Sequence, residues 1–147
     1  MSMEIGTTRR RARIVVAVLA ACGFVVVGAA PAAAQVLGDF NGDGVGDLAV
    51  GTPAESVVAR RFINGGFQNV TIAAAGTVTV IFGTASSGVQ ITSGSPRPQL
   101  IHQEVTGVED AAEANDNFGA ALAVGNFAGD ASDDLIVSVP GDNAIQI

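Results

Sequence analysis

The sequence predicts an all-β protein built of antiparallel strands, preceded by an N-terminal signal segment. Two observations predict this class. Gly76–Gly83 alternates apolar and β-branched residues with a period of two, which is typical of a half-buried strand. Beyond residue 34, no long stretch repeats its apolar residues at the spacing of a helix. The remaining elements are therefore expected to be strands joined by turns.

The N-terminus has the composition of an export signal. Four arginines between residues 9 and 13 precede an apolar stretch, Ile14–Val27. Residues 32–34 are all alanine and fit the small-residue pattern of a cleavage site, so cleavage after Ala34 is expected. Residues 1–34 are accordingly assigned to a signal peptide and left out of the predicted fold.

Three other interpretations of this segment stay open. Leu19–Cys22 matches a lipoprotein processing box, which would leave the protein anchored through a lipid on Cys22. Uncleaved, Ile14–Ala34 is long enough to span a bilayer, which takes about 20 residues. Arg9-Arg10 faintly resembles a twin-arginine signal, although the residues after the pair do not fit. All of these interpretations export the chain, so we expect a secreted or cell-surface protein with no stable membrane span after signal cleavage.

Beyond Ala34 the chain is strongly acidic. It keeps three basic residues (Arg60, Arg61 and Arg97) and thirteen of the fourteen acids, so its formal net charge is −10, against −7 for the whole sequence. This charge argues against nucleic acid, whose phosphates need a basic surface, and it suits a protein that holds divalent cations. Because the one cysteine, Cys22, lies in the signal, metal must replace some of the stabilisation that disulfides give other small exported domains.

Residues 39–47 read Asp-Phe-Asn-Gly-Asp-Gly-Val-Gly-Asp, and this motif is the most specific chemical signal in the chain. Oxygen donors recur at every second position, with glycines between them. Three carboxylates brought together repel one another unless a cation lies between them. Carboxylate, amide and backbone oxygens suit a hard cation with flexible coordination, which indicates Ca²⁺. The expected ligands are the side chains of Asp39, Asn41, Asp43 and Asp47 and the backbone carbonyl of Val45.

The spacing excludes an EF-hand, whose loop needs a glutamate at position twelve, where this chain has Val50, and a helix afterwards. Leu48–Pro53 is instead short, apolar and ended by proline, as in a strand. Gly42, Gly44 and Gly46 are expected to supply the positive φ angles of a tight winding. Two alternatives stay open. One is an Asx- and Gly-rich turn without an ion; the other is a phosphate cradle, although no helix follows and neither glycine fingerprint is present.

The pattern of residues 37–53 returns over residues 124–140, at an offset of 87. Phe40 coincides with Phe127, and the other positions shared by the two copies include the aspartate that closes each loop. The chain therefore contains an internal repeat with one strand–loop–strand unit in each copy.

The second loop, residues 126–134, is expected to be the poorer cation site. Asn126 replaces a carboxylate by an amide, and Ala128 has no donor in its side chain. Three aspartates remain: Asp130, Asp133 and Asp134. Of these, Asp133 adds charge without an obvious ligand position. The alternative is a vestigial loop held by hydrogen bonds from its Asx side chains.

Between and after the two loops the sequence predicts further strands and turns. Phe62–Phe67 has a glycine turn between apolar flanks and predicts a hairpin. Ser86–Pro98 is rich in Ser, Gly and Pro, as in a loop, and Asp110–Ala114 is expected to hold one helical turn. Short strands are predicted over Leu100–His102, Ala120–Val124 and Leu135–Val139, and another is expected to begin at Ala144.

Asn117–Pro140 resembles an FG-GAP repeat. Phe118-Gly119 is the FG, and Ser138-Val139-Pro140 stands where the family has GAP, a departure at two of the three positions. Gly51-Thr52-Pro53 of the first copy is closer, but that copy lacks its own Phe-Gly. The resemblance covers most of residues 36–147.

The FG-GAP family resembles the blade unit of the β-propeller at the head of integrin α-chains, a four-stranded antiparallel sheet with calcium in its first hairpin. The resemblance implies propeller-type blades in an incomplete propeller, about one and a half repeats. Repeat 1 spans residues 35–105, and an incomplete repeat 2 spans residues 106–147. The resemblance carries calcium binding onto the first loop and, more weakly, onto a second site. That second site consists of Asn126, Asp130, Ser132 and Asp134.

The resemblance implies a calcium-binding extracellular module for protein or glycan binding, as in adhesion, without catalysis. Open blade edges also favour self-association. The alternative is a non-catalytic fragment or remnant of a larger exported hydrolase that contains a propeller. A catalytic triad would have to use His102, the sole histidine, and the sequence has no nucleophile elbow and no His/Cys metal cluster. The Arg60-Arg61 pair is expected to be a solvated flank of the hairpin.

Overall fold

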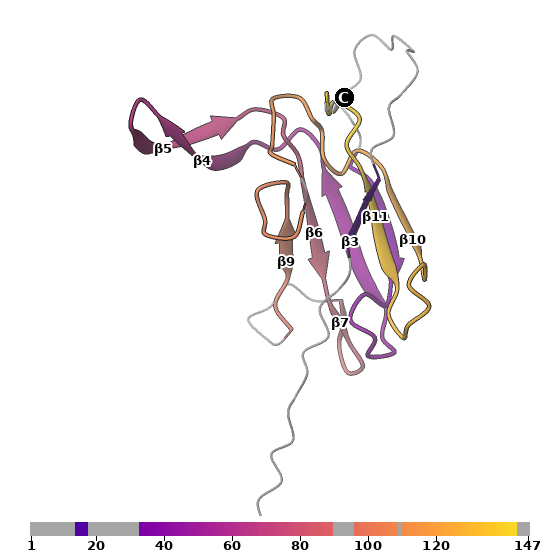
Figure 1. Ribbon diagram of the computed structural model, residues 1–147. Coiled ribbons are helices and arrows are strands. Elements are labelled where there is room, and N and C mark those ends of the chain that lie inside the picture. Colours follow the sequence, from indigo (N-terminus) through magenta and orange to yellow (C-terminus); the bar gives the residue numbers. More distant parts are fainter. Residues whose placement is uncertain (1–13, 18–32, 90–95, 109, 144–147) are drawn as a thin grey trace, which may run out of the picture.

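The computed structural model describes residues 14–17, 33–89, 96–108 and 110–143. These residues are all-β and contain no helix, hence none long and apolar enough to cross a membrane. The strands form two open sheets and two hairpins (Figure 1). The larger sheet is antiparallel, in the order β2-β3-β6-β9. Its strands are β2 (Gln35–Gly38), β3 (Asp47–Thr52), β6 (Thr77–Ile81) and β9 (Gln99–Ile101).

The second sheet has the order β1-β11-β10. Its strands β10 (Leu122–Gly125) and β11 (Asp134–Ser138) are antiparallel and flank the second loop, as β2 and β3 flank the first. On the other side of β11 lies β1 (Ile14–Ala17), which pairs in parallel, with Ile14 opposite Leu135. A strand from the expected signal segment thus completes this sheet, while the processing of that segment stays a prediction.

A long hairpin, β4 (Val57–Ile63) and β5 (Gly66–Ile72), projects from the sheets (Figure 1). Its two-residue turn is Asn64-Gly65, with φ angles of 52° and 82°. Positive φ at both positions matches the twist of a tight hairpin, and Asn-Gly is the pair that accepts it most readily. A second, much shorter hairpin consists of β7 (Gly83–Thr84) and β8 (Gly88–Val89).

The main hydrophobic core lies between the two sheets. Its largest side chains are Phe40, from the first loop, and Phe118, which precedes β10; both are at most 1% exposed. The other buried members come from both sheets and from the segment after β11: Ala49, Val78, Val80, Ile101, Leu135, Val137 and Val139. Because one core draws on both sheets, the two repeats pack against each other as adjacent blades do.

The strands predicted for both repeats are confirmed, each to within a few residues. Together they form open, antiparallel, propeller-type blades, which confirms the expected fold class. The expected strand from Ala144 on lies outside the described residues. The helical turn expected over Asp110–Ala114 does not form. The chain just after it bonds instead to the segment between β5 and β6, where the amides of Asn115 and Phe118 donate to the carbonyls of Ala73 and Ala75.

Candidate metal site

The first loop joins β2 to β3, as predicted, and winds around the carboxylate of Asp39. One oxygen, Oδ1, accepts hydrogen bonds from the amides of Gly42 and Asp43, at 2.8 and 3.1 Å. The other, Oδ2, accepts one from the amide of Gly44, at 2.8 Å. Three successive amides therefore point at one side chain, which fixes the first half of the loop.

Asn41 and Asp43 repeat this arrangement on a smaller scale. The amide oxygen of Asn41 accepts from the backbone N–H of Asp43 at 2.9 Å, and Oδ1 of Asp43 accepts from the N–H of Val45 at 2.8 Å. Asn41 also donates its side-chain amide to Oδ2 of Asp43. Each side chain bonds to the amide two residues ahead, the geometry of an Asx turn.

Asp47 closes the loop at the first position of β3, and its side chain is fully buried. Its two oxygens accept hydrogen bonds from the amides of Phe40 and Gly83, both at 2.8 Å. Burial raises the pKa of the Asp47 carboxyl above its ordinary value, and these two amides oppose the rise. The charges of Asp43 and Asp39 raise the pKa further, because they repel the ionised form.

The glycines of the first loop behave as predicted at two of three positions. Gly42 and Gly44 have φ angles of 71° and 83°. Gly46 does not adopt a positive φ, so that part of the prediction is wrong. Gly46 directly precedes β3, and the bends of the loop end at Val45.

The second loop has the same plan with fewer bonds. Asn126 takes the place of Asp39, but its side-chain oxygen accepts from one amide, that of Gly129, at 2.7 Å. Asp130 accepts from the N–H of Ser132 at 3.0 Å. The carboxylate of Asp134, buried like that of Asp47, accepts from the amides of the two residues after Asn126, at 2.7 and 2.9 Å.

The two loops contact each other, which the sequence did not reveal. Oδ2 of Asp133 accepts a hydrogen bond from the amide of Asp39 at 2.8 Å, and the amide of Asp133 donates to the carbonyl of Asp39, also at 2.8 Å. Nearby, Gly42 lies so close to the hydroxyl of Ser132 that a Cβ there would be 2.7 Å from it. Asp133, which had no obvious ligand position in the sequence, therefore joins the first loop to the second through these two hydrogen bonds.

The donors of the first loop suit a hard cation. Among the described residues, no three His, Cys, Asp or Glu side chains are gathered in a ready-made metal cluster. The carboxylates of Asp39 and Asp43 nevertheless lie near enough to Asp47 for their charges to add to the rise that burial causes in its pKa. A carboxylate oxygen that accepts one amide retains further acceptor capacity, and Asn41 and the carbonyl of Val45 add neutral oxygens. This donor set fits Ca²⁺ better than a softer metal.

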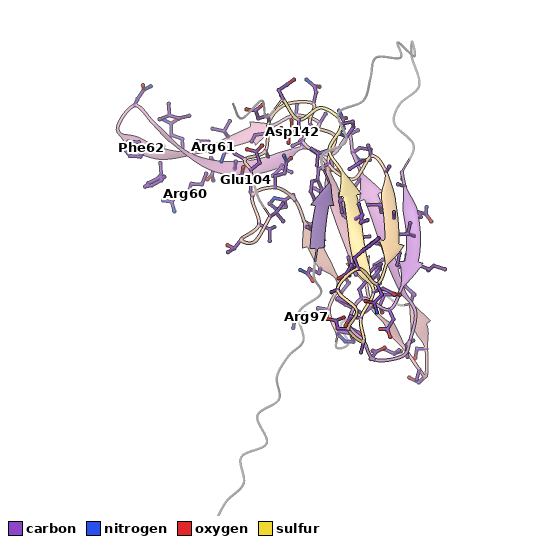
Figure 2. All side chains as sticks on the ribbon, turned by 45° about the vertical axis from the view of Figure 1, so that its right-hand side comes forward. Arg60, Arg61, Phe62, Arg97, Glu104 and Asp142 are labelled. Carbon is purple, nitrogen blue, oxygen red and sulfur yellow. The ribbon has the colours of Figure 1, made fainter. Side chains whose placement is uncertain are left out.

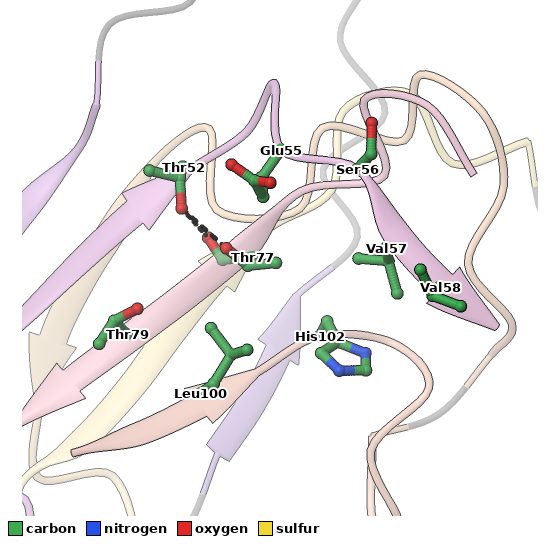
Figure 3. A pocket seen from close by; sticks show the side chains of 9 residues that line it. All are labelled: Thr52, Glu55, Ser56, Val57, Val58, Thr77, Thr79, Leu100 and His102. Atoms are coloured by element: carbon green, nitrogen blue, oxygen red, sulfur yellow. Dashed lines mark hydrogen bonds between the residues drawn. The ribbon is translucent and has the colours of Figure 1, made fainter. Parts of the chain in front are cut away.

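A second polar feature is a hollow of about 380 Å³ beside the base of the β4–β5 hairpin (Figure 3). It contains His102, whose Nδ1 accepts a hydrogen bond from the amide of Glu104 at 3.3 Å. Thr52 and Thr77 share a hydrogen bond of 2.7 Å between their hydroxyls on its wall. No hydrogen bond joins His102 to another side chain of this hollow in the described part of the chain, so a catalytic relay is not assembled there. The full lining is Thr52, Glu55, Ser56, Val57, Val58, Thr77, Thr79, Leu100 and His102.

The arginines of the hairpin have different surroundings (Figure 2). The guanidinium of Arg61 donates two hydrogen bonds to the carboxylate of Glu104, at 2.7 and 2.5 Å. Arg60 lies over the ring of Phe67, 4.9 Å from its centroid, and this ring meets that of Phe62 edge-on. The expectation of a solvated flank is confirmed for Arg60, which is exposed, and is wrong for Arg61, which is half-buried against Glu104 and the carbonyl of Ala112.

A sequence model of the FG-GAP repeat family matches residues 30–81. This part of the chain is similar to an FG-GAP repeat. The match includes β2, the first loop, β3 and β6, and so covers three strands of the four-stranded sheet. FG-GAP repeats build integrin-α-like β-propellers and are in general not catalytic. No protein of curated function and no solved structure matches the chain.

Sequence reasoning found both loops but missed the residues that hold them in place. The amide of Gly83 and the side chain of Asp133 lie 36 and 94 residues from their partners in the first loop. The one available signal was the doublet Asp133-Asp134, because an extra acid beside the closing aspartate has no counterpart in the first loop.

Proposed function

We propose that this chain is an exported FG-GAP module that binds calcium in its first loop and presents an extracellular protein- or glycan-binding surface, without catalysis. The observation that carries this proposal is the winding of residues 39–47, in which the side chains of Asp39 and Asp43 hold the loop's amides and lie near the buried carboxylate of Asp47. Burial raises the pKa of the Asp47 carboxyl most, and repulsion by the charges of Asp43 and Asp39 raises it further. A carboxylate under such repulsion, in a chain with few basic residues, needs a compensating positive charge.

A bound calcium ion would supply that charge and could accept oxygens from the whole loop. The loop's own residues do the rest. Asp47 ties the loop to the start of β3 through the amides of Phe40 and Gly83. Asp39 gathers the amides of the first turn. Because the loop connects β2 to β3, a loop that is kept rigid also fixes the register between these two strands.

A calcium titration of the full-length chain, followed by calorimetry and thermal melting, tests this function. Extracellular modules hold calcium with dissociation constants of about 10⁻⁴–10⁻³ M. At 10 mM calcium this corresponds to about 1–3 kcal/mol of stabilisation. Asp43→Ala should abolish that stabilisation, and Asp130→Ala, in the poorer second loop, should reduce it much less. Equal effects of the two changes would refute the ranking of the loops, and a melting curve indifferent to calcium would refute the function.

Export and self-association belong to the same proposal. The arginine-rich start and the apolar stretch after it support secretion or attachment at the cell surface, the latter through Cys22 if the lipoprotein box is used. At the far edge of the larger sheet, β9 has one neighbour, β6, among the described strands. Size-exclusion chromatography should therefore show compact oligomers that form with calcium and dissociate in chelator. Aggregation in both conditions would favour a remnant without function.

A further inference from the structure

Asp133 connects two loops that are far apart in the sequence. Its carboxylate accepts the amide of Asp39, and its amide donates to the carbonyl of Asp39, so one residue of the second loop holds both backbone groups of one residue of the first. No equivalent pair of bonds holds any other residue of the first loop among the described contacts. Asp133 is followed directly by Asp134, which is buried at the start of β11. The second sheet is therefore linked to the backbone of Asp39.

Asp39 is the residue whose position matters most for a cation in the first loop. Its two carboxylate oxygens accept the amides of Gly42, Asp43 and Gly44 and so set the shape of the winding. A shift of the Asp39 backbone moves this carboxylate with it. A cation site with mobile ligands binds more weakly, because the entropy lost when the ligands become ordered opposes binding.

We propose that Asp133 is a positioning residue for the first loop, through which calcium binding by that loop and docking of the second sheet strengthen each other. This inference rests on the proposed calcium function and deepens it. The coupling is reciprocal by thermodynamic necessity: if a docked second sheet raises the calcium affinity, bound calcium must hold the second sheet in place by the same factor. Calcium thus controls the contact between adjacent blades as well as the fold of one loop.

Asp133 could also act simply by its negative charge, and two substitutions separate these roles. Asp133→Asn removes the charge but keeps a side-chain oxygen that can accept the amide of Asp39. Asp133→Ala removes both. A positioning role predicts that Asn preserves most of the calcium affinity of the wild-type chain and Ala does not, whereas a purely electrostatic role predicts that both changes weaken binding alike.

The experiment is a calcium titration of the full-length chain by calorimetry, in the wild type and the two variants. Asp133→Ala should weaken calcium binding about tenfold, and Asp133→Asn less than about threefold, as expected for the loss and retention of one hydrogen bond. Glu113→Ala is the matched control, because it removes an exposed carboxylate remote in sequence from both loops, and it should leave the affinity unchanged.

A second measurement needs no variant. Amide hydrogen exchange at Asp133, whose N–H donates to Asp39, should slow at least about fivefold when calcium is added to the wild-type chain. If the wild type binds calcium but exchange at Asp133 is unchanged, or if Asn and Ala weaken binding equally, the coupling is refuted and the calcium function stands. If the wild type binds no calcium, the proposed function itself is refuted and this inference with it.

Discussion

The buried carboxylate of Asp47 accepts hydrogen bonds from two amides that belong to different parts of the chain, Phe40 in the first loop and Gly83 after β6. It thereby satisfies two donors that would otherwise be buried without partners, which is costly. Asp134 has the corresponding place in the second loop, where it accepts from the amides of Phe127 and Ala128. Whatever these aspartates contribute to a cation, they also hold the loops to the sheets.

Asp47→Asn should therefore destabilise the chain even in chelator. An asparagine amide can accept one of the two N–H groups through its oxygen but presents its own donors to the other. The expected loss is about 1–3 kcal/mol, the cost of leaving a buried donor unsatisfied. Urea unfolding in chelator measures it. The control is Asp43→Asn, at an exposed position, which should change the free energy of unfolding by less than about 0.5 kcal/mol.

The positions of both loops between their strands were predictable from the spacing of donors and glycines, because that pattern is local. The partners of those residues were not. Asp133 was recognised as a surplus charge, but its bonds to Asp39 depend on how two sheets pack. Asp47 was predicted as a ligand, and its role as an acceptor for Gly83 depends on where the chain returns after β6.

The β4–β5 hairpin is anchored to the rest of the molecule near its base and in its middle. At the base, a small apolar cluster contains Val57, Ala59, Ile72, Ala75 and Ala112. In the middle, Arg61 and Glu104 form a two-pronged ion pair, with side chains 32% and 19% exposed. The hydrogen bonds from Arg61 hold the pKa of Glu104 below its ordinary value.

This lowered pKa makes the stability of the chain depend on pH. Because the folded state lowers the pKa of Glu104, the ion pair contributes fully above the ordinary value of 4.5 and is lost as the pH falls through the lowered value. Glu104→Gln should cost about 1 kcal/mol at pH 7, the upper range for a partly exposed pair. The difference from the wild type, measured by urea unfolding, should shrink steadily below pH 4.5. A difference independent of pH would show that the pair contributes nothing through its charge.

Elements that depend on local sequence were predicted well. Asn64-Gly65 specifies a tight turn by itself, and the β-branched alternation of Gly76–Gly83 specifies β6. The predicted helical turn over Asp110–Ala114 was wrong because the next residues gain more from bonding to the chain between β5 and β6 than from a single isolated turn. The strand β1 could not be foreseen, because its residues were assigned to a signal and its partner β11 lies over 100 residues away.

The two repeats meet across a contact that leaves no space for side chains. Gly51 of β3 faces the backbone of Gly119, and a Cβ at Gly51 would overlap the carbonyl oxygen of Gly119. Phe118, beside it, is fully buried in the shared core. Phe118 and Gly119 of the second repeat therefore pack directly against the first repeat. Their contact there is Gly51, which stands at the GAP position.

Gly51→Ala should consequently be severe, because the obstacle is backbone on both sides and cannot rotate away. We expect a loss of about 3 kcal/mol in the free energy of unfolding, as for overpacking at a rigid site. Gly46→Ala provides the contrast. No atom lies within 4 Å of a Cβ at Gly46, and its φ is not positive, so the change should be neutral or slightly stabilising in chelator. Similar losses from the two substitutions would contradict this packing.

In the first repeat, β3 pairs with β2 along one edge and with β6, antiparallel, along the other. In the second repeat, β11 pairs with β10 along one edge and with β1, in parallel, along the other. The strand β1 thus has the position beside β11 that β6 has beside β3. Cleavage after Ala34 would strip it off and expose a ladder of unpaired peptide groups along Leu135–Ser138. If residues 1–34 are the signal peptide that we propose, their removal would leave this edge of β11 free to pair with a strand of another chain.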